Sequence, residues 1–206
     1  MGLLSSSVSI TRYHVKGEIS GPTIETVRSG LKQFAISKLD DEEAVDKISG
    51  WASLEQPYQT DFDKDTWLFG SYFVFSLRID KKNISARIVK KHVTREINKR
   101  LAESKREYLS KNEKKTVKED VLLMLAKRIP STPNVYDVVW DYEKKTLWFF
   151  SNLKAANEEL ETLFTKAFNL HLIRLFPYTT AVCGGTGIPE EKVDQLDGLS
   201  ATFFTE

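Results

Sequence analysis

The fold class of this chain is decided by residues 135–151, which have the sequence VYDVVWDYEKKTLWFFS. Val135–Trp140 and Thr146–Ser151 are short runs rich in β-branched and aromatic residues, and the polar stretch Asp141–Lys145 separates them. Two such runs around a short polar connection predict a β-hairpin. A hairpin joins antiparallel strands, so the sheet cannot consist only of parallel βαβ units.

Outward from this hairpin, hydrophobic periodicity predicts the other elements. We expect strands at 7–15, 67–79 and 170–176, and helices at 23–38, 116–128 and 154–168. A further helix has an apolar stripe formed by Ala86, Val89, Val93, Ile97, Leu101 and Tyr108. Strands and helices mix without strict βαβ alternation. The predicted fold class is therefore α+β, with mixed or antiparallel sheets and basic amphipathic helices.

Three segments are predicted to connect or end these elements. The segment around Trp51 and Pro57 shows no clear periodicity, and Ser110–Lys115 is polar enough to be a link between two helices. Pro130 and Pro133 should end the second of those helices.

The chain is expected to be one unit of 206 residues that can be subdivided into three parts. A sheet-containing body comprises 1–80 and 134–182, a basic helical segment comprises 81–133, and a loose acidic tail comprises 183–206. Cys183 is the one cysteine, which excludes an internal disulfide framework. The N-terminus shows no signal-peptide pattern, and no run of about 20 apolar residues exists. We expect a cytoplasmic protein.

Charge is distributed very unevenly along the chain. Between Lys81 and Arg128 there are sixteen Lys and Arg against six Asp and Glu, an excess of ten positive charges. The remaining residues hold fourteen basic against twenty-three acidic residues, an excess of nine negative charges, although the formal net charge is only +1. A concentrated basic region attracts polyanions. Nucleic acid is therefore the first partner to consider.

The basic region carries few acids that could neutralise it locally. Glu96 can pair with Arg100, but most of the cations have no acidic residue four positions away. DNA phosphates would supply the missing counter-charge, with a salt-sensitive affinity and little sequence preference. An acidic protein partner and a plain solvated surface are the alternatives.

Patterns typical of catalytic and metal sites are incomplete. The triplet Asp61, Asp63 and Asp65 resembles the start of a calcium loop, but the Gly and Glu that the loop needs later are replaced by Thr66 and Tyr72. A solvated loop before a strand is the expected structure, and a two-metal nuclease is the alternative.

Other candidate groups are equally isolated. Gly184–Gly187 lacks the Lys-Ser/Thr of a phosphate loop, so a turn is expected. His14, His92 and His171 have no metal spacing, and Cys183 has no recognisable partner. We expect no catalytic residue, no metal site and no cofactor.

Several features follow one another in a recognisable order. They are Ile10-Thr11-Arg12-Tyr13, Gly50-Trp51 with Pro57 after it, and, over Ile84 to Phe176, a long basic helix, Lys114–Leu122, a hairpin with Trp140-Asp141, a helix opening near Lys154-Ala155-Ala156 and a strand before Pro177. This order resembles the recombination-associated RdgC family of bacterial DNA-binding proteins, members of which have also been catalogued as exonucleases. The resemblance covers most of the chain. Its motifs are patterns of fold and charge, not catalytic signatures.

The resemblance implies sequence-independent binding of double-stranded DNA by a homodimer that closes into a ring with a positive lining. It also implies a link to recombination and replication, in which the protein restrains RecA-promoted strand exchange, and a nucleoid location. The expected phosphate-contacting residues are Lys90, Lys91, Arg95, Lys99, Arg100, Lys111, Lys114, Lys115 and Lys118. A metal-dependent nuclease and a module that docks an acidic partner remain the competing functions.

Two departures from the family pattern affect these expectations. Longer relatives continue beyond the point that matches Glu206, so we expect a short form in which part of the ring-closing surface is missing. Relatives also carry Arg and Phe together after the second basic helix, whereas Arg128–Pro133 contains no aromatic residue. Insertion of a side chain between base steps is therefore not expected.

Overall fold

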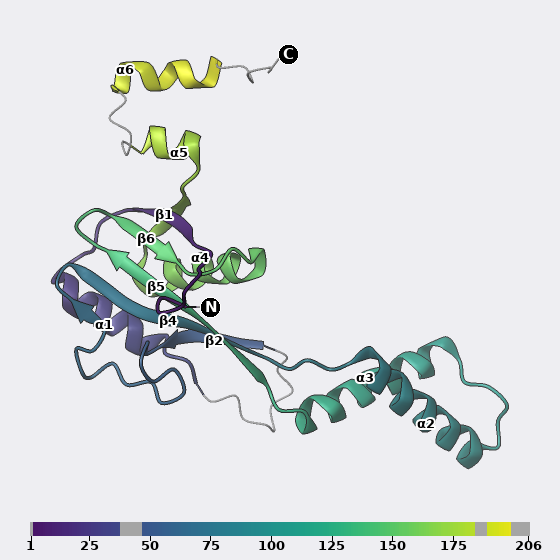
Figure 1. Cartoon of the computed structure of the whole chain (residues 1–206). Coiled ribbons are helices and arrows are strands. Elements are labelled where there is room, and N and C mark those ends of the chain that lie inside the picture. The colour runs from purple at the N-terminus through teal and green to yellow at the C-terminus, as the bar shows by residue number, and fades with distance from the viewer. Residues whose placement is uncertain (1, 38–46, 184–188, 199–206) are drawn as a thin grey trace. The chain divides into compact units, whose positions relative to one another are not determined.

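The computed structural model describes residues 2–37, 47–183 and 189–198. The helices and strands follow in the order β1 (Thr11–Lys16), α1 (Thr23–Gln33), β2 (Lys47–Ala52), β3 (Leu68–Phe69), β4 (Tyr72–Lys81), α2 (Ala86–Ser104), α3 (Lys111–Arg128), β5 (Thr132–Asp141), β6 (Thr146–Phe149), α4 (Lys154–Phe168), β7 (His171–Arg174), α5 (Pro177–Val182), α6 (Glu190–Val193) and the 3₁₀ helix η1 (Asp194–Gly198) (Figure 1). The predicted α+β class is confirmed.

One seven-stranded sheet has the strand order β2-β4-β5-β6-β1-β7, and β3 pairs with β4. The predicted hairpin is the antiparallel pair β5–β6, in which Val138 lies opposite Phe149 and Trp140 lies opposite Leu147. Strand β1 then pairs antiparallel with both β6 and β7. The hairpin thus lies in the interior of the sheet, where its apolar residues are covered.

The chain divides into two compact units. The sheet unit comprises residues 1–35, 51–77 and 136–206, and the hairpin unit comprises residues 36–50 and 78–135. Both boundaries that flank the basic region lie inside strands, β4 and β5. The three-part division expected from the sequence stays a prediction, because its tail, 183–206, is described only at Cys183 and over 189–198.

Aromatic side chains form the core of the sheet unit. Trp140 contacts Phe164 edge-on at 5.0 Å between ring centroids and lies 5.4 Å from Phe168. Trp51 stacks on Phe168 at 5.8 Å. Helices α1 and α4 approach closely at Gly30, where a Cβ atom would lie 2.7 Å from the carbonyl oxygen of Ala167. The glycine permits this approach because it has no side chain.

Several predicted boundaries in the sheet unit are wrong. The first helix ends at Gln33, short of the predicted Lys38, since Ala35 leaves the helix and forms a β-bridge with Trp51. The predicted single strand 67–79 is the tight pair β3–β4, which turns at Gly70 with a φ of 60°. Only glycine adopts that φ readily, so the residue type marks the turn.

Other elements were not predicted. Strand β2 was missed because Lys47–Ala52 lacks strict alternation, although Trp51 within it is fully buried. Helix α5 was not predicted, and it begins directly after the predicted strand 170–176. Its first residue is Pro177, and proline in the first turn is a common sign of a helix start. Strand β5 begins at Thr132, before the predicted Val135, so Pro133 lies within it; the end of α3 at Arg128 is as predicted. The tail contains α6 and η1.

The hairpin unit contains α2 and α3, which lie side by side (Figure 1). Its core is a small cluster of buried aliphatic residues formed by Leu109, Val117, Val121 and Leu125. Val89, Val93, Ile97 and Leu101 of α2 are only partly buried against this cluster. One side of each helix is thereby covered, and most of the charged residues lie on the remaining, exposed surface.

Candidate nucleic-acid interface

Helix α3 begins at Lys111, five residues before the predicted start at Thr116. Its first turn is fixed by a capping box: the Ser110 backbone N–H donates to Glu113 Oε2 at 2.7 Å, and the Glu113 N–H donates to Ser110 Oγ at 3.3 Å. The Ser-x-x-Glu signature at 110–113 could have revealed this start. Lys111, Lys114 and Lys115 are consequently helical residues and do not belong to a link.

Helix α2 is shorter than its predicted apolar stripe. It ends at Ser104, with Lys105 in the left-handed conformation at a φ of 51°. Tyr108 is 78% exposed and Ala86 is exposed, so neither belongs to the stripe. The four central aliphatic residues of the prediction do contact the hairpin core.

All nine predicted phosphate-contacting residues lie on these two helices. Lys90, Lys91, Arg95, Lys99 and Arg100 are on α2, and Lys111, Lys114, Lys115 and Lys118 are on α3. Eight of them are exposed and Arg100 is half-buried. The hairpin thus brings two stretches of basic residues, separated in the sequence by the 105–110 loop, onto one small structure.

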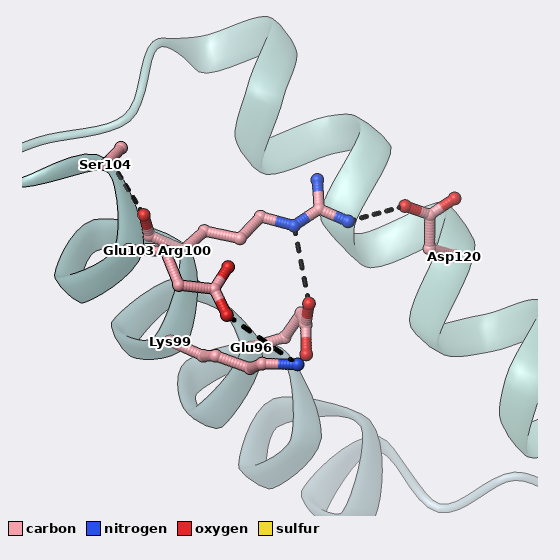
Figure 2. A network of polar contacts seen from close by, with 6 residues as sticks. All are labelled: Glu96, Lys99, Arg100, Glu103, Ser104 and Asp120. Atoms are coloured by element: carbon pink, nitrogen blue, oxygen red, sulfur yellow. Dashed lines mark hydrogen bonds and ion pairs between the residues drawn. The ribbon is translucent and has the colours of Figure 1, made fainter.

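Arg100 differs from the other eight because it connects the two helices (Figure 2). Its Nη2 donates to Asp120 Oδ2 of α3 at 2.9 Å, and its Nε donates to Glu96 Oε1 one turn earlier in α2 at 3.4 Å. The hydrogen bond to Asp120 is the main cause that raises the pKa of Arg100 above its ordinary value. The Glu96 pair was predicted, whereas spacing along one helix could not reveal the Asp120 contact.

Three further ion pairs neutralise cations of the hairpin. Lys99 Nζ lies 4.0 Å from Glu103 Oε1, and Lys115 Nζ lies 3.8 Å from Glu119 Oε1. Arg106 Nη1 donates to Glu113 Oε1 at 3.2 Å. The Ser110 N–H is the largest cause that lowers the pKa of Glu113, and Arg106 adds to it.

Six of the nine residues make no ion pair with any residue that the structure describes: Lys90, Lys91, Arg95, Lys111, Lys114 and Lys118. Exposed like charges repel one another, so a surface of this kind favours binding of a polyanion.

Two open grooves lie between the helices. The first, about 450 Å³, is lined by His92, Arg95, Glu96, Lys99, Arg100, Asp120, Val121, Met124 and Arg128. The second, about 370 Å³, is lined by Arg100, Glu103, Ser104, Arg106, Leu109 and Glu113. Arg100 borders both grooves, so both lie along the side of the hairpin that holds the ion pairs.

The aspartate triplet lies in an exposed loop of the sheet unit that precedes β3, as the sequence predicted, but its carboxylates have partners that the sequence did not show. Asp63 pairs with Lys32, and Asp65 Oδ1 accepts from Arg28 Nη2 at 2.6 Å. Asp61 Oδ1 accepts from the Asp63 N–H at 2.8 Å, and the Lys32 hydrogen bond is the main cause that lowers the pKa of Asp63. These carboxylates therefore attach the 61–65 loop to α1.

The remaining candidates stay apart. His14 is half-buried in β1, where burial and the charge of Lys145 lower its pKa, and His171 is exposed in β7. His92 borders the first groove. Gly184–Gly187 lies outside the described residues, and Cys183 is half-buried beside it. No group of three His, Cys, Asp or Glu in the part of the chain that the structure describes could hold a metal ion.

A comparison with protein families matches residues 9–182 to the family described as "Putative exonuclease, RdgC". The matched range covers most of the 206 residues, including both hairpin helices and the whole sheet. The chain belongs to the RdgC family. A search among curated proteins finds no match.

Membership of the RdgC family fits a recombination-associated role in DNA binding. The description of the family also includes the word exonuclease, but the family match by itself does not assign a catalytic activity to this chain. Over residues 2–37, 47–183 and 189–198, no helix is long and apolar enough to cross a membrane.

Proposed function

We propose that this RdgC family member binds the phosphate backbone of double-stranded DNA through its α2–α3 hairpin, independently of sequence and without catalysis. The observation that supports the proposal most strongly is the set of six exposed cations that make no ion pair with any described residue. Salt-dependent release of counterions from DNA would drive the association.

The residue types also favour backbone binding over recognition of bases. Seven of the nine predicted contact residues are lysines, and two, Arg95 and Arg100, are arginines. Lysine acts as a flexible point charge, whereas bidentate recognition of guanine is typically made by arginine. Arg100 is moreover occupied by Glu96 and Asp120. A surface of this composition should neutralise phosphates with little discrimination between sequences.

The family match supports the cellular role that we propose. A protein that covers duplex DNA in recombination or replication would compete with RecA for that DNA and so restrain strand exchange. The proposed assembly is a homodimer with the basic hairpins on its inner surface, in the cytoplasm and on the nucleoid. Measuring the mass in solution with and without a short duplex tests the dimer; a monomer under both conditions would contradict it.

Anisotropy titrations with two labelled duplexes of equal length and unrelated sequence test DNA binding itself. If all six unpaired cations contact phosphates, the slope of log K against log salt should be about −5. Both duplexes should bind with the same affinity within about threefold, because phosphate contacts carry no sequence information. Salt-independent binding, or strong preference for one duplex, would contradict the proposal.

A metal-dependent nuclease is the second candidate, because the matched family is described as an exonuclease. Labelled DNA incubated with Mg²⁺ or Mn²⁺ decides between the two functions. We expect intact DNA. Cleavage that requires the metal and is lost in Asp63→Ala would establish the nuclease instead. In a gel mobility-shift assay, failure to retard duplex DNA even at low salt would favour a third function, in which the hairpin docks an acidic protein.

A further inference from the structure

The hairpin has two lateral sides that differ in charge, and helix geometry identifies them. Successive residues of an α-helix are rotated by about 100°, so the residue before an inward-facing position lies on one side and the residue after it lies on the other. In α2 the inward residues recur every four positions from Val89 to Leu101, and in α3 they are Val117, Val121 and Leu125. The two helices run antiparallel across a short loop, which brings the matching sides together.

We call the side of the preceding residues the paired flank. Glu96 and Arg100 precede Ile97 and Leu101, and Asp120 precedes Val121. Glu103 and Glu113 lie seven positions from Glu96 and Asp120, and therefore fall on the same side. Each of these four acids makes an ion pair, with Arg100, Lys99 or Arg106. Both grooves open on this flank, where the four acids partly neutralise the cations; Arg95 and Arg128 also border the first groove.

We call the side of the following residues the open flank. Lys90, Thr94 and Asn98 follow inward residues of α2, and Lys118 follows Val117 in α3. Lys111, seven positions before Lys118, lies on the same side. No acid occupies these positions. Of the two remaining acids between 81 and 128, Glu107 is in the loop and Glu119 pairs with Lys115 at the edge of this flank.

We infer that the open flank is the side of the hairpin that contacts DNA phosphates, and that the paired flank faces away from the DNA. This inference rests on the proposed function and deepens it, because it narrows the nine predicted residues to a contact surface. Lys90, Lys111 and Lys118 are the central contacts. Arg87, one turn before Lys90 and exposed, joins them, although the sequence did not single it out as a contact.

The electrostatic reason is the position of the acids. A carboxylate close to a phosphate repels it over distances up to the Debye length of about 8–10 Å at moderate salt. Glu96, Glu103, Glu113 and Asp120 would all meet the phosphates on the paired flank. On the open flank, the short uncharged side chains of Thr94 and Asn98 leave the lysines unobstructed and can themselves donate hydrogen bonds to phosphate oxygens.

Two triple variants with the same change in net charge test the inference. The first removes the open flank by Lys90→Gln, Lys111→Gln and Lys118→Gln. The control removes three cations elsewhere on the hairpin by Arg106→Gln, Lys127→Gln and Arg128→Gln. Arg106 and Arg128 border the grooves, and Lys127 lies seven positions after Asp120 on the paired flank. Each full-length protein is titrated with labelled duplex DNA at several salt concentrations, and circular dichroism checks the helix content.

We expect the open-flank variant to reduce the magnitude of the salt slope by about 2.7 and the affinity near 0.1 M salt by about two orders of magnitude. The control should change the slope by less than about 1, since long-range charge alone acts on it. The single variant Lys118→Gln should reduce the magnitude of the slope by about 0.9. It tests the same contact independently if the triple variant does not fold.

Three results would overturn the inference. Equal losses in the two triple variants would mean that net charge alone matters, and a larger loss in the control would assign the DNA to the paired flank. In both cases the wild-type protein still binds DNA, so the proposed function survives. Absence of salt-dependent binding in the wild type would instead overturn the proposed function together with the inference.

Discussion

The sheet unit and the hairpin unit of this protein are stabilised in different ways. In the sheet unit, large aromatic side chains such as Trp51, Trp140 and Phe164 are almost completely buried. In the hairpin unit, α2 has no buried residue in its described span, and the core consists of four aliphatic side chains. A small core leaves most of the helix surface in solvent, and that surface can carry the concentrated positive charge. The comparison teaches that positive charge is concentrated where the fold buries few side chains.

Removal of one aromatic ring from the sheet unit should have the largest effect. Phe164 is fully buried between Trp140 and Phe168, so Phe164→Ala should lower the free energy of unfolding by about 3–5 kcal/mol. Urea denaturation followed by tryptophan fluorescence measures the change. Phe69→Ala is the matched control, because Phe69 is 51% exposed. Similar losses for both variants would show that the aromatic core does not dominate the sheet unit.

Truncation in the hairpin core should have a smaller and more local effect. Leu125 is 4% exposed, and Leu125→Ala should cost about 2–4 kcal/mol. Hydrogen exchange should show faster exchange over α2 and α3 than over β5 and β6, because the hairpin can open as a separate unit. Leu123→Ala, at a position 51% exposed, serves as the control. Equal acceleration in both units would mean that the chain unfolds as one body.

Loss of the helix cap should come next. Ser110 Oγ accepts from the Glu113 N–H, and Ser110→Ala should cost about 0.5–2 kcal/mol. Ser104→Ala is a suitable comparison, since Ser104, at the other end of the loop, donates its hydroxyl to the Arg100 and Leu101 carbonyls of its own helix and caps no backbone N–H. Thermal denaturation followed by helical circular dichroism provides the measurement. A greater loss from Ser104→Ala would contradict the role assigned to the cap.

The cap should also make the hairpin sensitive to acid. The Ser110 N–H and hydroxyl lower the pKa of Glu113, so the folded state binds its proton less readily than the unfolded state does. This contribution to stability is present above the unfolded value of about 4.3 and is lost as the pH falls through the lowered pKa. Glu113→Gln should weaken the loss of α3 helicity in this acid range. An unchanged acid transition in that variant would contradict the linkage.

The cross-helix ion pair should have the smallest effect. Arg100 is half-buried and Asp120 is exposed, so solvent still screens this ion pair and it contributes little. A double-mutant cycle with Arg100→Gln and Asp120→Asn should give a coupling of stabilising sign that weakens as salt is raised. A coupling as large as the loss from Leu125→Ala would mean that ion pairs, and not the aliphatic cluster, hold the hairpin together.

Local signals in the sequence predicted the elements that have strong local patterns. The β5–β6 hairpin and α4 were predicted at or near their observed ends, because their apolar periodicity is strong. Strand β2 was missed because its burial depends on Trp51 contacting Phe75 and Phe168, which are distant in the sequence. The start of α3 was missed although its capping box was visible, since the lysines around it suggested a polar link.

The basic surface was predicted less completely than the fold. All nine residues lie on the two helices, but their spacing could not show that Asp120 would occupy Arg100. The pairing of the aspartate triplet with Lys32 and Arg28 of α1 is another contact between distant segments. Such contacts depend on how elements fold together, so a single sequence does not specify them.

By itself, the sequence determined that this protein is α+β and where its positive charge is concentrated, because composition and periodicity are local properties. It assigned Lys111, Lys114 and Lys115 to a link, and the structure places them in α3. Only the tertiary structure decided which side of the hairpin each charged residue occupies. The antiparallel arrangement of α2 and α3 brings the four acids and their partners to one side of the hairpin and leaves Lys90, Lys111 and Lys118 on the other. The physical reason is that the side on which a residue lies is set by the apolar positions that face the neighbouring helix.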